Sequence, residues 1–62
     1  MNNYLTELVG REVMLWSVTG QGEHRDDGVF EGCDGAFVKL RKNEVTLYFP
    51  IYVVRLIRPK AD

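Results

Sequence analysis

The fold is decided by Gly28-Val29-Phe30-Glu31-Gly32-Cys33-Asp34 and by Phe37-Val38-Lys39-Leu40 shortly after it. Both segments are rich in β-branched and aromatic residues, which favour strands. Glycine weakens a strand but permits a sharp bend. Gly28 and Gly32 therefore predict a strand that bends to serve both halves of a small barrel.

Strand signals recur at short intervals along the rest of the chain. Valine, isoleucine, threonine and the aromatics make up 20 of the 62 residues, and only two residues are alanine. Short strands separated by turn residues are typical of a β-sandwich or a small barrel. We expect an all-β domain with five strands at residues 12–18, 28–33, 36–41, 44–49 and 52–57, a hairpin turn at Lys42-Asn43 and a break at Pro50.

A short helix is predicted before the first strand, over residues 3–10. Leu5, Leu8 and Val9 would share one of its faces, and Gly10 suits the left-handed end of a helix. So short a helix does not persist alone, so this face must pack on the barrel. A chain of 62 residues holds one domain, which we divide into a helical segment at 1–10, a barrel at 11–58 and a tail at 59–62.

Three segments resemble the Sm-like family, which includes the LSm and Hfq-like proteins. The opening Leu5-x-x-Leu8-Val9-Gly10-x-x-Val13 is similar to the helix-to-strand junction of that family. The bent strand at 28–34, with the segment 37–40, is similar to the family's first signature. The segment Phe49-Pro50-Ile51-Tyr52-Val53-Val54-Arg55-Leu56-Ile57 resembles the Ile-Pro-x-x-x-Ile-x-x-Ile ending of bacterial members.

This resemblance implies a five-stranded SH3-like barrel with an N-terminal helix. It also implies a ring in which the fourth strand of one subunit pairs with the fifth strand of the next, and the binding of single-stranded RNA. The chain departs from the family in four places. Phe37-Val38 follows Asp34-Gly35-Ala36 where the eukaryotic pattern carries an asparagine, and residues 19–27 are longer and more acidic than the usual short loop. The Arg-Gly of the second signature is missing, and Tyr48-Phe49-Pro50 stands near the place where Hfq has Tyr-Lys-His. The cations that hold RNA at a ring pore are therefore not matched.

Charge is distributed unevenly along the chain. Residues 1–35 hold two basic and seven acidic side chains, whereas residues 36–62 hold six basic and two acidic ones. This pattern indicates either a basic C-terminal half that attracts a polyanion or ordinary solvated faces.

The third expected strand contains candidate RNA-binding residues. If the even-numbered residues from Ala36 to Leu40 face the core, Phe37, Lys39 and Arg41 share the opposite face. An exposed aromatic ring beside two cations suits a stacked base and its phosphates. The alternative is that the helix or a neighbouring subunit covers Phe37.

A fourth candidate, Asp34, precedes this strand. Aspartate before a glycine favours a turn, here at Asp34-Gly35. The family resemblance also places this position near the RNA site, so Asp34 is grouped with the three residues of the strand.

Catalytic or metal chemistry is not expected. The run Glu23-His24-Arg25-Asp26-Asp27 gathers possible metal ligands, but one histidine beside an arginine favours a solvated loop over residues 19–27. Ser17, His24 and Cys33 are the only residues of their types, which leaves almost no material for a nucleophile, a base and an orienting group. We expect no enzyme activity, no metal and no cofactor.

Apolar residues occupy both faces of several expected strands. A small barrel has one inside, and a short helix covers little of its outside. At about 25 cal/mol per Å² of apolar surface, leaving these side chains in water forfeits several kcal/mol. Association through the fourth and fifth strands would bury them and satisfy both strand edges. We expect a homo-oligomeric ring whose interface includes Tyr48, Tyr52, Val53 and Leu56.

No apolar run approaches the roughly 18 residues of a membrane span, and one cysteine allows no internal disulfide. We therefore expect a cytoplasmic protein without membrane contact. The leading hypothesis is a ring-forming Sm-like protein that binds single-stranded RNA. The alternative is a non-enzymatic protein-interaction or assembly module with an SH3-like barrel and no nucleic-acid role. Salt-dependent binding of a short A- or U-rich RNA distinguishes them, because phosphate contacts release counterions.

Overall fold

The computed structural model describes residues 4–60. The expectations for residues 1–3 and 61–62, at the start of the helical segment and the end of the tail, lie outside the described residues. About 67% of the described chain is strand, so the all-β class is confirmed. The elements are the 3-10 helix η1 (Tyr4–Leu8), β1 (Glu12–Thr19), β2 (Gly22–Cys33), β3 (Phe37–Lys42), β4 (Val45–Pro50), the 3-10 helix η2 (Ile51–Val53) and β5 (Val54–Pro59).

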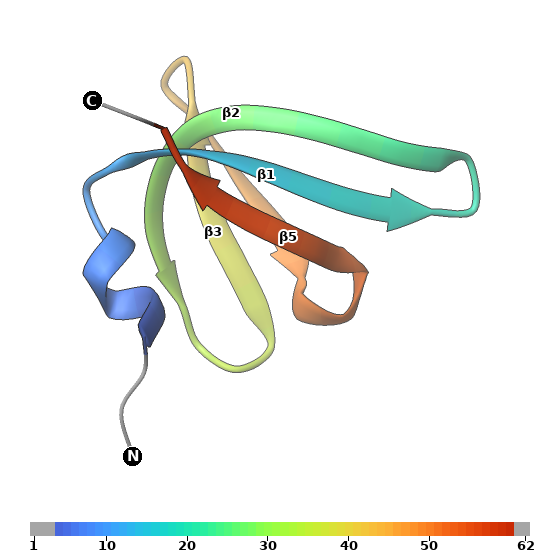
Figure 1. The fold of residues 1–62 in the computed structure, drawn as a ribbon, viewed down its shortest axis with the longest axis horizontal. Coiled ribbons are helices and arrows are strands. Elements are labelled where there is room, and N and C mark those ends of the chain that lie inside the picture. Colours follow the sequence, from blue (N-terminus) through green and yellow to red (C-terminus); the bar gives the residue numbers. More distant parts are fainter. Residues whose placement is uncertain (1–3, 61–62) are drawn as a thin grey trace.

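The five strands form one antiparallel sheet in the order β4-β3-β2-β1-β5 (Figure 1). Each strand runs antiparallel to its neighbour, so β4 and β5 at the two edges run in the same direction. The sheet is not closed, because β4 and β5 do not pair with each other. Closure within one chain would require a parallel pair between these two edges.

The central strand β2 bends between two partners. It pairs with β1 over residues 22–29 and with β3 over residues 29–33, so Val29 is the one residue that pairs on both sides. A side chain at Gly28 would place its Cβ 2.6 Å from the backbone oxygen of Arg41. The absence of a side chain therefore lets β2 pass close to β3 at this bend.

The first half of β2 corrects one expectation. We predicted a solvated loop at 19–27, whereas β2 begins at Gly22 and only Gly20-Gln21 connects it to β1. The charged residues of this half pair in register with β1, for example Asp26 with Leu15. In Figure 1 this hairpin extends beyond the other strands. Pairing with the apolar strand β1 outweighs the weak strand preference of the charged residues.

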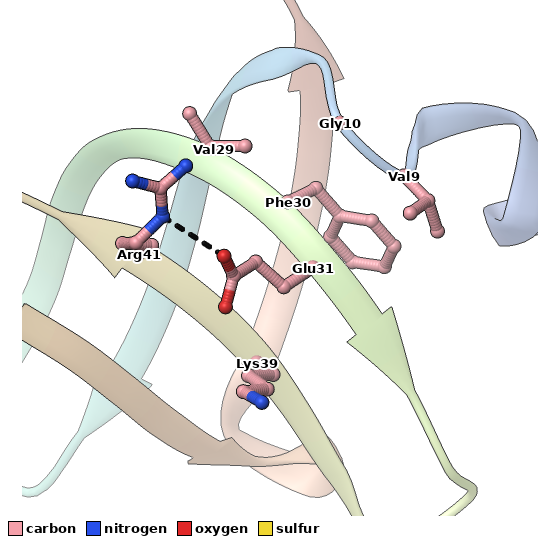
Figure 2. A pocket seen from close by; sticks show the side chains of 7 residues that line it. All are labelled: Val9, Gly10, Val29, Phe30, Glu31, Lys39 and Arg41. Atoms are coloured by element: carbon pink, nitrogen blue, oxygen red, sulfur yellow. Dashed lines mark hydrogen bonds and ion pairs between the residues drawn. The ribbon is translucent and has the colours of Figure 1, made fainter.

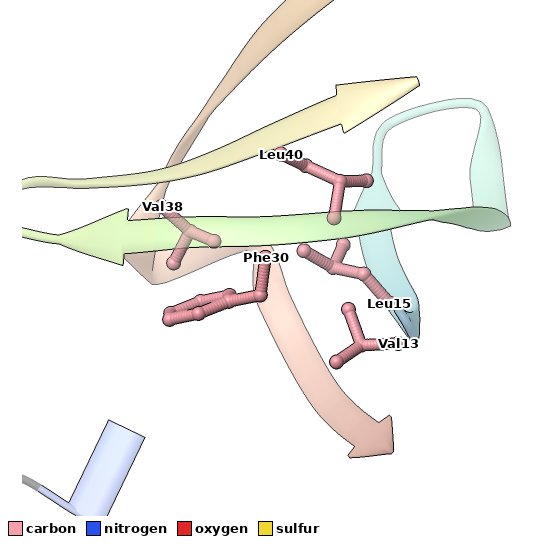
Figure 3. Close-up of a cluster of buried hydrophobic side chains, with 5 residues drawn as sticks. All are labelled: Val13, Leu15, Phe30, Val38 and Leu40. Carbon is pink, nitrogen blue, oxygen red and sulfur yellow. The ribbon is translucent and has the colours of Figure 1, made fainter. Parts of the chain in front are cut away.

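The core lies on one face of the sheet. Val13 and Leu15 alternate along β1 with the half-buried Met14 and Trp16, as expected for a strand with one buried face. The fully buried apolar side chains meet from β1, β2 and β3, as Figure 3 shows: Val13, Leu15, Phe30, Val38 and Leu40.

The N-terminal helix is shorter than expected and is a 3-10 helix. Leu5 and Leu8 pack against the core, as predicted, but Val9 exposes 53% of its surface and does not belong to that face. Gly10 has φ +88°, and its N–H donates to the carbonyl of Phe30 at 2.8 Å. Neither 3-10 helix of residues 4–60 is long and apolar enough to cross a membrane.

The last two strands differ from the expected boundaries. The β3–β4 turn lies at Asn43-Glu44, both with positive φ, one residue later than predicted. Pro50 ends β4, and residues 51–53 form η2 where we expected the start of the fifth strand. The N–H of Ile51 donates to the carbonyl of Ala36 at 2.8 Å, which ties η2 to the start of β3.

We predict that Gly28→Ala lowers the free energy of unfolding by about 1–3 kcal/mol, because the new Cβ must displace the backbone of β3. Urea denaturation followed by circular dichroism measures this loss. Gly20→Ala is the matched control, since a Cβ there meets nothing within 4 Å, and its effect should stay within about 0.5 kcal/mol. Equal effects of the two substitutions would contradict the close approach as the reason for Gly28.

Candidate nucleic-acid interface

The face of β3 opposite the core carries the predicted row of residues. Val38 and Leu40 are buried, and Phe37, Lys39 and Arg41 alternate with them on the other face. Phe37 exposes 45% of its surface, so helix η1 does not cover it. The expectation for Ala36 was wrong: it precedes the strand, is exposed and lies outside the core.

Asp34 shapes the turn that leads into β3. Its Oδ1 accepts hydrogen bonds from the backbone N–H groups of Ala36 and Phe37, each at 2.9 Å. These bonds favour the ionised carboxylate and lower the pKa of Asp34 below its ordinary value. The turn role that we predicted for this residue is confirmed, and the same bonds hold the backbone of Phe37 in place.

Tyr48 joins this row from the neighbouring edge strand. It lies directly opposite Lys39 in the β3–β4 register, and the Lys39 ammonium nitrogen is 5.9 Å from the centre of its ring. This distance is within reach of a cation–π interaction. We expected Tyr48 at the subunit interface but missed it as a neighbour of the candidate RNA-binding residues.

These residues line a small cavity of about 180 Å³. It contains two exposed aromatic rings, one cation and one carboxylate, which can accommodate a planar ring with a nearby negative charge. Its lining residues are Gly32, Cys33, Asp34, Phe37, Lys39 and Tyr48. The structure thus brings together three of the four predicted residues and adds Tyr48. We name this group, Asp34, Phe37, Lys39 and Tyr48, the aromatic platform.

Arg41 lies beyond the aromatic platform on the same row. Its Nε donates to the Glu31 carboxylate at 2.9 Å, so this cation already has an acidic partner. It lines a second cavity of about 460 Å³, which Figure 2 shows together with Glu31 and Lys39. Lys39 lines both cavities and so connects Arg41 to the aromatic platform.

Ion pairs join the acidic and basic parts of the sequence. Four of the five ion pairs between described residues connect a carboxylate of residues 1–35 with a cation of residues 36–62. They are Arg41–Glu31, Lys42–Asp26, Arg55–Glu23 and Lys60–Asp27. The uneven distribution along the chain therefore does not produce a separate basic half in the folded molecule. The predicted row on β3 contains two cations, Lys39 and Arg41. Among residues 4–60, Arg41 has an ion-pair partner and Lys39 has none.

The carboxylates of residues 23–27 in β2 take part in such ion pairs. Arg25 donates to both carboxylate oxygens of Asp27, at 2.9 and 3.0 Å, and lowers the pKa of that carboxyl to about 2. Lys60 also contacts Asp27, at 3.3 Å. Among the described residues, no group of three or more histidine, cysteine, aspartate or glutamate side chains could hold a metal ion.

The predicted interface residues lie at or near the two free edges. Tyr48 is on β4 and Leu56 is on β5, where they expose 61% and 43% of their surfaces. Tyr52 and Val53 were expected on the fifth strand but belong to η2 between the two strands. Tyr52 exposes 86% of its surface, whereas Val53 is half-buried.

Comparison with known proteins adds no relative: no family model, curated protein or solved structure matches the chain.

We predict that the stability of the fold falls below about pH 4 partly through Asp34. The folded-state pKa of Asp34 lies below its unfolded-state pKa. The ionised carboxylate therefore gives its full stabilisation of the fold above the unfolded-state pKa, and this stabilisation is lost as the pH falls through the folded-state pKa. Asp34→Asn keeps an acceptor oxygen but cannot titrate, so its urea midpoint should fall less between about pH 5 and pH 3 than that of the wild type. An equal fall in Asp34→Asn and the wild type would contradict this role.

Proposed function

We propose that this chain is an Sm-like module that binds single-stranded RNA on the aromatic platform and assembles into a ring through β4 and β5. The observation that carries the proposal is one cavity lined by the exposed rings of Phe37 and Tyr48 together with Lys39 and Asp34. Two accessible rings offer stacking surfaces, and Lys39 offers charge for a phosphate. Asp34 provides a carboxylate, which accepts hydrogen bonds from base N–H groups.

The small number of free cations favours a single-stranded ligand over a duplex. Non-specific duplex binding depends on many phosphate contacts. Here four of the basic side chains of residues 36–62 are held in ion pairs with the chain's own carboxylates. Stacking on Phe37 and Tyr48 must then supply much of the affinity, and stacking requires unpaired bases.

The two edge strands support the proposed assembly. Strand β4, Val45–Pro50, contains no charged residue, and exposed edges without charges readily pair with another chain. Strand β5 carries Arg55 and Arg58, so pairing β5 with a second β5 would bring like charges together. Pairing β4 with the β5 of a second copy avoids that repulsion, and its head-to-tail repetition closes a ring where the rotation between successive copies adds up to a full turn.

The direction of the strands supports the same arrangement. Strands β4 and β5 run in the same direction within one sheet. For the β5 of a second copy to pair antiparallel with β4, the second copy must be turned over, so that its core face and its outer face exchange sides. The outer residue Leu56, opposite Trp16, then lies beside the core-facing residues of the neighbouring β4, such as Leu47. This arrangement accounts for apolar residues on both faces of the edge strands, and the added strand covers the side that is open in the single chain.

We predict that Phe37→Ala weakens binding of short fluorescein-labelled oligo(U) or oligo(A) about 5- to 150-fold, as the loss of about 1–3 kcal/mol of stacking requires. Fluorescence anisotropy at low salt measures the affinity. Tyr4→Ala, which removes another exposed ring outside the platform, is the control and should bind as the wild type. Wild-type protein that binds neither RNA would overturn the proposed RNA function, and unchanged binding by Phe37→Ala would remove Phe37 from the site.

We predict a solution mass that is a multiple of the 7.1 kDa chain, measured by light scattering at micromolar concentration. Leu56→Lys should lower this mass, because a charge would be buried beside the neighbouring copy. Val9→Lys, a substitution at another exposed aliphatic residue away from both edges, is the control. A monomeric wild-type chain would overturn the ring.

A further inference from the structure

Glu31 occupies an irregular position in β2. The β2–β3 pairing passes from Phe30–Leu40 directly to Gly32–Lys39, so Glu31 is the extra residue of a β-bulge and has no partner in the ladder. A bulge redirects a side chain relative to a regular strand. Here the redirected carboxylate reaches Arg41, with its Oε2 2.9 Å from Nε.

The pair lies within the cavity of about 460 Å³ beside the aromatic platform. In Figure 2 the Glu31 carboxylate lies between Arg41 and Lys39. These three are the charged residues among those that line the cavity, so Glu31 reduces two positive charges to a net charge of one. The remaining lining residues are Val9, Gly10, Val29 and Phe30.

The Glu31–Arg41 pair is suited to exchange. The side chains expose 28% and 49% of their surfaces, and an exposed ion pair contributes little to stability. The pair uses Nε alone among the five N–H donors of the guanidinium. A phosphate can therefore approach the terminal nitrogens and replace the carboxylate at small cost.

We infer that Glu31 competes with RNA phosphate for Arg41 and thereby sets the affinity and selectivity of the site; this inference rests on the proposed RNA-binding function. With Arg41 neutralised, a phosphate alone gains little from the site. A ligand must also stack on Phe37 or Tyr48 to bind well. Glu31 therefore disfavours duplexes, whose bases are not accessible for stacking, and other polyanions that offer no accessible aromatic ring.

The test compares Glu31→Gln, Arg41→Gln and the double variant by anisotropy with labelled oligo(U) and oligo(A), between about 50 and 200 mM salt. Glu31→Gln should bind several-fold more tightly than the wild type. Its plot of log affinity against log salt should be steeper by about 0.7, the increment for one more phosphate contact of a single strand. In the Arg41→Gln background, where Lys39 is the cation of the cavity that Glu31 still screens, Glu31→Gln should give a much smaller gain in affinity and no change in the salt slope. Glu7→Gln, which removes one negative charge elsewhere, should bind as the wild type.

The outcomes separate the two claims. If the wild type binds RNA and Glu31→Gln shows the same affinity and the same salt slope, the inference is overturned and the proposed function stays in place. An equal gain in Glu7→Gln, or in the Arg41→Gln background, also overturns it, because the effect would then be one of net charge. No binding by the wild type overturns the proposed function, and the inference with it.

A second measurement uses the wild-type chain alone. The ¹⁵N resonance of the Arg41 Nε reports its hydrogen bond with Glu31, so saturating oligo(U) should shift it as phosphate replaces the carboxylate. The Arg55 Nε, which donates to Glu23, is the internal control and should not shift. An unchanged Arg41 signal in the RNA-bound protein would overturn the exchange.

Discussion

The structure depends on the division of β2 between two partners. Its first part pairs with β1 and its second part with β3, and the change occurs at Gly28-Val29, where β2 passes too close to the Arg41 carbonyl for any side chain. This bend directs the first part into the charged hairpin. It also places Glu31 beside Lys39 and Arg41 on the outer face of β3. The position of Glu31 beside the aromatic platform thus follows from this bend.

Much of the site could be predicted from alternation alone. Val38 and Leu40 are apolar at a spacing of two, so Phe37, Lys39 and Arg41 had to share the other face once this segment was a strand. The turn at Asp34 followed from its local chemistry, because a carboxylate before glycine caps nearby N–H groups. These features depend on residues that are neighbours in the sequence, so they can be predicted from one sequence.

The remaining features depend on register and on distant partners. A turn at Lys42-Asn43 would have placed Thr46 opposite Lys39, but the turn at Asn43-Glu44 places Tyr48 there. Gly32 indicated a bend at this point of β2, but neither the extra residue at Glu31 nor the pairing of Glu31 with Arg41 was predicted. Charged residues 23–27 have weak strand preference, and their strand is supported by β1 and by cations from the other half of the chain, such as Arg55 and Lys60.

Tyr48 connects the proposed assembly to the proposed site, because it belongs to the free edge strand β4 and also faces Lys39. In a ring formed through β4 and β5, the turned-over neighbour would bring its core-facing β5 row, which includes Ile57, to the side of β4 that carries Tyr48. That contact would restrict the ring of Tyr48 before any ligand arrives. Less side-chain entropy would then be lost on stacking a base, so assembly would strengthen RNA binding without adding a contact to the RNA.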